Sequence, residues 1–354
     1  MKKTKEKRLL QLPISIVLLC VTFLGCGVIT WFSGVDYWFW LLLIPSVFVI
    51  VQLTSVSHEF GHYIATVKSG FEVYYFKCSI FTVDKYGRRK FRISLFGEHL
   101  GEIRFYPKKE VDYCSALKKS LWGGLIGGII IAIALNLVLC LALLGVFGNV
   151  ASPYISLIFS FSPYATYSLV INAIAWFHPE NDASKIIQIK QNAEQKTAIN
   201  NFYTVQKRLF DGKTYAEIPS EYFLIGENAS LDVKLPLSVY ALRKAIEEKD
   251  LETAQNLAEN IESYGDLNRE ICCELLYLFV VLGNAEKARK YESVFSLDLD
   301  ENEPYVLRAK LARLKFIGDE RYFNVLKPTA LKVCERKTFC KGDVIYNQKL
   351  IENL

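Results

Sequence analysis

The sequence predicts an α-helical polytopic membrane protein with four transmembrane helices, a small cytoplasmic β-sheet insertion and an all-α cytoplasmic C-terminal domain. Hydrophobic residues make up 51% of the 354 residues. Long uncharged runs concentrate in the first half of the chain, whereas Lys, Glu, Asp and Asn concentrate in the second. This division indicates a membrane domain joined to a polar one. The basic clusters flank the apolar runs, which is typical of topology signals, so we expect no nucleic-acid partner.

Four apolar segments are long enough to cross the roughly 30 Å of bilayer hydrocarbon, which takes about 20 residues. They are residues 9–32, 37–56, 121–147 and 154–177. The first is too long for the apolar region of a signal peptide, and no convincing cleavage site follows it, so we expect a retained helix. The helical pattern of the second continues to about Lys68.

The distribution of Lys and Arg predicts the orientation of these helices. The first eight residues carry five of them and the loop 69–119 carries eleven, whereas the links 33–36 and 148–153 carry none. Because positive loops stay in the cytoplasm, we expect the N-terminus, this loop and the C-terminal half to be cytoplasmic. The sequence thus predicts a multi-pass protein of a bacterial cytoplasmic membrane, in contact with the lipid bilayer. Residues 1–36 would form the N-terminal cytoplasmic tip and the first transmembrane helix.

The insertion at residues 71–107 has the pattern of β-strands. Residues 71–76 and 90–96 are aromatic and β-branched, and residues 84–87 supply a turn between them. A third short strand is predicted at residues 102–106. We therefore expect a small sheet at the cytoplasmic face of the membrane domain.

The C-terminal part, residues 237–354, has a repeated helical pattern, and residues 188–236 are predicted to link it to the membrane domain. Residues 250–254 resemble residues 284–288 at an offset of 34, and an amphipathic run precedes each. This period predicts an array of helical hairpins like tetratricopeptide (TPR) repeats, which would offer a surface to a regulatory protein. The nine cysteines include no CxxC pair, which is typical of reduced thiols and not of a disulfide framework.

The chemistry is carried by an HExxH motif that begins at His58 and follows directly on the second apolar segment. On a helix, His58 and His62 lie one turn apart on one face and can bind a single Zn²⁺, while Glu59 can take a proton from the bound water. Zinc lowers the pKa of that water to about 7. The alternative is that these are ordinary polar residues at a helix end. An ionisable group at this depth costs roughly 2.5–3.5 kcal/mol, however, which favours a functional role.

A catalytic zinc usually has a third protein ligand, and the end of the fourth apolar segment offers three candidates. Asp182 is the first choice, His178 the second and Glu180 the third, because the predicted topology brings this segment to the same side as the HExxH motif. Asp182 has a second interpretation as the N-cap of a helix that begins at Ala183.

Residues 37–187 resemble the site-2 protease family of intramembrane zinc metalloproteases. The resemblance depends on the HExxH motif, on a glycine-rich segment at residues 123–128, and on the pattern formed by Asn172, Pro179 and Asp182. It implies that His58, His62 and Asp182 bind zinc, that Glu59 is the general base and that Asn172 helps to hold the substrate. The chain departs from the family pattern at Ala183, where glycine is common, and in the lack of a proline in the glycine-rich segment.

These observations predict an intramembrane metalloprotease core at residues 37–187. It would hydrolyse a peptide bond in or near a transmembrane segment of a membrane protein or peptide precursor. The alternative from another class is a catalytically inactive adaptor, or pseudoprotease, that binds its substrate through the helical cytoplasmic domain; Glu59 argues against it, since a pseudoenzyme needs no base. A transporter is disfavoured because no inverted repeat is visible.

Overall fold

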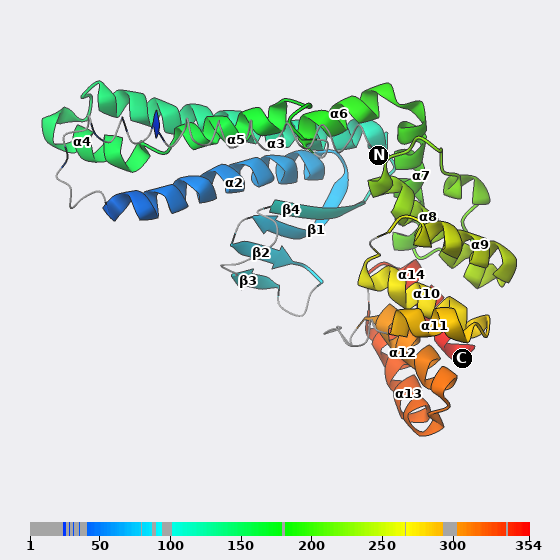
Figure 1. Cartoon of the computed structure of the whole chain (residues 1–354). Coiled ribbons are helices and arrows are strands. Elements are labelled where there is room, and N and C mark those ends of the chain that lie inside the picture. Colours follow the sequence, from blue (N-terminus) through cyan, green and yellow to red (C-terminus); the bar gives the residue numbers. More distant parts are fainter. Residues whose placement is uncertain are drawn as a thin grey trace. The chain divides into compact units, whose positions relative to one another are not determined.

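A computed structural model describes residues 24, 25, 28, 31, 35, 41–78, 80–86, 90–93, 101–178, 181–265, 267–292, 303–337 and 339–354. The chain is mostly helical and divides into two compact units, Met1–Gln191 and Asn192–Leu354. Figure 1 shows the helices and strands of both. The first predicted transmembrane segment, residues 9–32, lies almost wholly outside the described residues.

Three helical segments of the first unit are long and apolar enough to cross a membrane: Leu43–Lys68, Tyr113–Leu143 and Gly148–Ala173. The first is α2 and the second is α3. The third consists of α4 (Gly148–Phe159) and α5 (Pro163–Ala173), which meet at a short turn. These segments correspond to the second, third and fourth predicted spans. Helix α3 begins earlier than predicted because Asp112 caps it, accepting a hydrogen bond of 3.1 Å from the backbone N–H of Ser115.

Helices α2 and α3 are in contact through their glycines. A Cβ added to Gly61 would lie 2.2 Å from the carbonyl oxygen of Gly123, and one added to Gly123 would lie 2.4 Å from that of Gly61. Next to this crossing, the Ser57 hydroxyl donates to the carbonyl oxygen of Gly127 over 2.9 Å. The two backbones therefore approach as closely as small-residue motifs allow in membrane helices.

The insertion between α2 and α3 is a four-stranded antiparallel sheet in the order β3-β2-β1-β4. Its strands are β1 (Phe71–Cys78), β2 (Phe81–Asp84), β3 (Phe91–Ile93) and β4 (Gly101–Pro107). The sheet was predicted, but β2 was not, because its four residues are too few to show an alternating pattern. Strand β4 pairs with β1 and lies at one edge of the sheet, while β3 lies at the other.

Helix α6 (Asp182–Gln191) ends the first unit, and the second unit contains eight further α-helices among the described residues. They are α7 (Ala193–Phe210), α8 (Leu231–Glu248), α9 (Leu251–Glu262), α10 (Arg269–Val281), α11 (Ala285–Glu292), α12 (Pro304–Ile317), α13 (Glu320–Arg336) and α14 (Lys341–Glu352). A short 3-10 helix, η2 (Ser220–Phe223), lies between α7 and α8.

Three consecutive helix pairs, α8–α9, α10–α11 and α12–α13, pack as hairpins. The three connecting turns are alike: Lys249, Gly283 and Gly318 all have positive φ. The residue after each then caps the second helix of the pair. Asp250, Asn284 and Asp319 accept hydrogen bonds of 3.0–3.1 Å from the backbone N–H three residues on. This turn is the origin of the sequence offset of 34.

The prediction that residues 188–236 form a linker was wrong. Most of this range belongs to the second unit and contains α7, η2 and the start of α8. Val205 and Leu209 of α7 and Tyr215 beyond it are at most 1% exposed and lie in the same apolar core as Leu242 and Leu275. The apolar stripe of α7 was overlooked because polar residues dominate its composition.

A group of buried charges lies in the core of the second unit. The carboxylate of Glu274 lies 2.9 Å from the guanidinium of Arg243 and 2.5 Å from that of Arg308. Arg308 and Glu274 are fully buried. Burial alone would raise the pKa of Glu274, but the two guanidinium groups outweigh it and hold the pKa below its usual value. The helices α8, α10 and α12 are thereby joined by one carboxylate.

Candidate metal centre

Helix α2 presents two imidazoles to one point. His58 and His62 are one turn apart, and their Nε2 atoms are separated by 3.2 Å. The rings meet edge to face, with centroids 4.7 Å apart and an interplanar angle of 89°. The two imidazoles of the HExxH motif therefore lie on one face of the helix, as predicted, because the i, i+4 spacing alone places them there.

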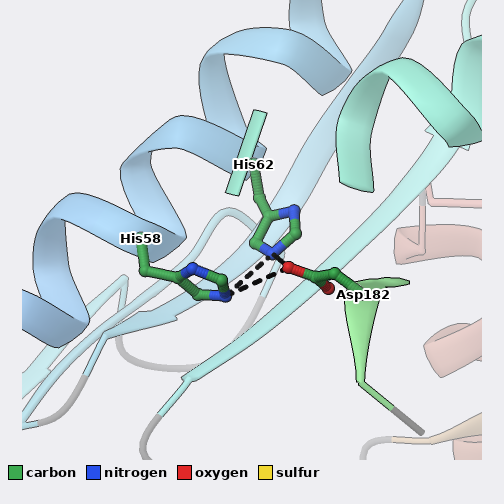
Figure 2. A group of neighbouring side chains, drawn as sticks. All are labelled: His58, His62 and Asp182. Atoms are coloured by element: carbon green, nitrogen blue, oxygen red, sulfur yellow. Dashed lines mark hydrogen bonds and ion pairs between the residues drawn. The ribbon is translucent and has the colours of Figure 1, made fainter. Parts of the chain in front are cut away.

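A carboxylate from α6 completes the group. Oδ2 of Asp182 lies 3.4 Å from Nε2 of His58 and 3.2 Å from Nε2 of His62, as Figure 2 shows. Asp182 is buried, and within the described part of the chain its Oδ2 atom accepts no hydrogen bond of normal geometry. Among the described residues, these three form the only group of His, Cys, Asp and Glu side chains whose donor atoms all lie within 4.8 Å of one another.

The hydrogen bonds around the imidazoles determine which ring nitrogen carries a proton and which offers a lone pair. Nδ1 of His62 lies 2.8 Å from the carbonyl oxygen of Ser120, which can only accept, so Nδ1 carries a proton. In the neutral ring, Nε2 then points a lone pair at Oδ2 of Asp182, which also has only lone pairs to offer. Such an arrangement is stable when a proton or a cation lies between them.

The distances fit a metal ion. Zinc bonds to imidazole nitrogen and carboxylate oxygen are about 2.0–2.2 Å long, and tetrahedral ligands at that radius are about 3.3–3.6 Å apart. The three observed separations are 3.2, 3.2 and 3.4 Å. The donor set of two neutral nitrogens and one carboxylate oxygen is also one that suits divalent zinc. The residues present therefore fit a zinc site with three protein ligands.

The glycine-rich segment of α3 makes room for this group. A Cβ added to Gly124 would lie 2.2 Å from Nε2 of His62, so any other residue there would displace the ring. The backbone of Gly124 also lies close to His58. The neighbouring Ser120 carbonyl holds His62, so the backbone of α3 orients this imidazole, as outer-shell partners do in metal sites.

Glu59 is half-buried and lies beside the sheet, outside the group of three donor atoms. A Cβ added to Gly101, the first residue of β4, would lie 1.9 Å from Oε1 of Glu59. Gly101 is paired with Cys78, the last residue of β1. The end of the β1–β4 ladder therefore lies directly against the Glu59 side chain.

The remaining predicted residues are less close to the centre. His178 is exposed and is not a member of the donor group, and Glu180 lies outside the described residues. The side-chain amide of Asn172 donates to the carbonyl oxygen of Ser168 in its own helix, α5, over 3.1 Å.

Sequence reasoning missed Asn181, Ser120 and Gly101. For Asn181 a signal existed, because Asn is a preferred N-cap. Its Oδ1 accepts a hydrogen bond of 2.8 Å from the backbone N–H of Ser184, so the cap that the sequence offered to Asp182 is made by Asn181 instead. The Asp182 carboxylate is thereby left for the imidazoles.

No protein-family model, no curated protein and no solved structure matches this chain. The class of protein must therefore be argued from the residues of the site and from the helices that carry them.

Proposed function

We propose that this chain is an intramembrane zinc metalloprotease of the site-2 protease type, which hydrolyses a peptide bond in or near a transmembrane segment of a membrane protein or peptide precursor. The observation that carries the proposal is the convergence of His58, His62 and Asp182 at one point, with two of the three on a helix apolar enough to span a membrane. The glutamate that follows the first histidine supports a hydrolytic role over simple metal storage.

The four residues of the proposed site would have separate roles. His58, His62 and Asp182 would hold the zinc ion, and the carboxylate offsets part of its double charge. The zinc ion would supply a Lewis acid that polarises the scissile carbonyl and makes water acidic enough to react near neutral pH. Glu59 would take the proton from the attacking water and deliver it to the leaving amine. The half-buried position of Glu59 beside the sheet limits the access of other water.

The proposal is tested by the zinc content of the detergent-purified protein. Wild type should hold one zinc ion per chain, and Asp182→Ala should lose most of it, because two neutral imidazoles alone leave the charge of the ion poorly balanced. His178→Ala is the matched control from the same segment and should keep its zinc. Elemental analysis after dialysis against a weak chelator measures both.

The opposite order of zinc loss would make His178 the third ligand and would break the match to the family. A wild-type protein that holds no zinc after reconstitution would overturn the proposal itself.

The outer edge of β4 offers a place for an unwound substrate. A transmembrane helix hides its peptide bonds in hydrogen bonds, so the substrate must be extended before hydrolysis, and an extended segment can pair with a free strand edge. Strand β4 begins at Gly101, beside Glu59, so a segment paired there would lie next to the proposed base. This supports an arrangement in which the sheet aligns the substrate.

The register of the sheet identifies which backbone groups face that edge. The N–H of Lys85 donates to the carbonyl of Tyr74, so Tyr74 directs its backbone groups to β2 and the next residue, Tyr75, directs them to β4. The partner of Tyr75 is Arg104, which faces β1. Ile103, one residue earlier, therefore directs its N–H and C=O to the outer edge.

Ile103→Pro should reduce cleavage at least tenfold while zinc content stays normal, because proline removes an outward N–H and leaves the pairing with β1 intact. The matched control is Ile93→Pro. By the same alternation Ile93 faces outward on β3, the opposite edge, since Asp84 N–H donates to the carbonyl of Lys90. Equal cleavage by the two variants would exclude the β4 edge as the substrate's place.

The second unit and the orientation of the chain belong to the same proposal. The positive-inside rule supports a cytoplasmic location for the sheet, for both termini and for the second unit. Three stacked helical hairpins give an extended surface of the kind that TPR-like arrays use for protein partners, and we propose that a regulatory protein binds there.

A further inference from the structure

We propose that Asn181 is a positioning residue for the metal centre, which holds the Asp182 carboxylate in place by fastening the end of α5 to the start of α6. The inference rests on the proposed zinc site and assigns a role to a residue outside the motifs that predicted it.

Both the nitrogen and the oxygen of the Asn181 side-chain amide form hydrogen bonds. Its Nδ2 donates to two carbonyl oxygens at the end of α5, those of Ile171 at 2.6 Å and Ile174 at 2.9 Å. Its Oδ1 accepts from the backbone N–H of Ser184, in the first turn of α6, at 2.8 Å. Asn181 is only 7% exposed, so these bonds form in a setting where an unpaired amide would be costly.

These bonds matter because Asn181 directly precedes Asp182 in the chain. Helix α5 ends at Ala173 and α6 begins at Asp182, so the carboxylate stands at the first residue of its helix. Its Oδ2 accepts no hydrogen bond of normal geometry from the residues that the structure describes, and it faces the two imidazoles. A metal ligand must be held within about 0.5 Å of its working position, which requires support from its neighbours.

The alternative is that Asn181 is only a helix cap. The two roles use different atoms, since the cap needs Oδ1 and the attachment to α5 needs Nδ2. Asn181→Ser separates them, because serine is an equally good N-cap but is too short to reach the carbonyls of Ile171 and Ile174. A cap-only role predicts wild-type zinc binding in this variant.

The second unit provides a matched control. Asn192 caps α7 in the same way, accepting from Gln195 N–H at 3.1 Å, and its Nδ2 donates to the carbonyl of Asn228 at 2.8 Å. It is a residue of the second unit and has no part in the donor group. Asn192→Ser therefore keeps the cap and removes the equivalent Nδ2 hydrogen bond, at a residue outside the metal centre.

The experiment measures the zinc dissociation constant of the purified full chain by competition with a chromophoric chelator, together with the thermal unfolding midpoint of the metal-free protein. Asn181→Ser should weaken zinc binding about 10–100-fold, as loss of outer-shell partners does, whereas Asn192→Ser should not change it. Wild-type zinc affinity in Asn181→Ser would overturn the inference. A wild-type protein that binds no zinc would instead overturn the proposed function.

Should Asn181→Ser yield no folded protein, Asn181→Asp replaces it. The carboxylate keeps the volume and the cap acceptor but cannot donate to the two carbonyls. Because an added negative charge near the site would by itself favour zinc, a weakened zinc affinity in this variant supports the inference, and an affinity above that of wild type overturns it.

Discussion

Glu59→Gln should stop cleavage while the protein keeps its zinc. The amide has the shape of the carboxylate but cannot take a proton from water, and loss of a general base costs about 10²–10⁴-fold in rate. The zinc ligands are untouched, since Glu59 lies outside the donor group. The measurement compares the zinc content of wild type and variant, and searches membranes of producing cells for new peptide termini that appear with wild type alone.

Glu110→Gln is the control for this experiment. It is the same chemical substitution, but Glu110 is exposed in the loop between β4 and α3, away from the site. Cleavage at the wild-type rate by Glu59→Gln would exclude the proposed mechanism. If wild type and variant both hold zinc and neither produces new termini, the inactive adaptor becomes the better interpretation.

Glu274→Gln should destabilise the second unit by about 3–5 kcal/mol, the range found when one partner of a buried ion pair is removed. Arg243 would retain Glu270 and Asp343, at 2.6 and 3.1 Å, but Arg308 would be left fully buried without its carboxylate. Hydrogen exchange of the α10 and α12 amides, combined with thermal unfolding of the full chain, measures the loss.

A matched substitution is Glu292→Gln, since Glu292 pairs with Arg313 at the surface, with side chains 30% and 38% exposed. Its effect should stay below about 1 kcal/mol. Equal effects of the two substitutions would show that burial of the charges is not what stabilises this core.

The same carboxylate predicts a dependence on pH. The pKa of Glu274 is lower in the folded protein than its ordinary value of 4.5. Its contribution to stability is therefore complete above pH 4.5 and is lost as the pH falls through the lowered pKa. Acid unfolding of Glu274→Gln should lack this part of the loss. An identical pH dependence of the unfolding midpoint in wild type and variant would contradict the assignment.

The part of the candidate site that depends on local helix geometry could be predicted from the sequence. His58 and His62 meet because helix geometry alone places i and i+4 on one face. The convergence of Asp182 with them agrees with the choice made from topology and family resemblance, although the zinc itself stays a prediction. Sequence reasoning missed Asn181, Ser120 and Gly101 because each acts through a contact with another element. A single sequence does not show which backbone carbonyl or strand end lies next to an imidazole or a carboxylate.

The fold shows the same division. The hairpins of the second unit could be predicted because their turns repeat a local pattern at Lys249, Gly283 and Gly318. The membrane helices could be predicted from length and hydropathy. Strand β2 and the packing of α7 depend on partners distant in sequence, and these were the features that sequence reasoning missed. Whether the hairpins form a true TPR array stays a prediction.

The close approach of Gly61 and Gly123 limits the route by which a substrate of the proposed protease could enter. A gap between α2 and α3 wide enough for a third helix would break this contact and separate His62 from the Ser120 carbonyl. In the proposed protease the α2–α3 pair would therefore stay closed, and substrate and product would pass beside α5, α6 and the outer edge of the sheet.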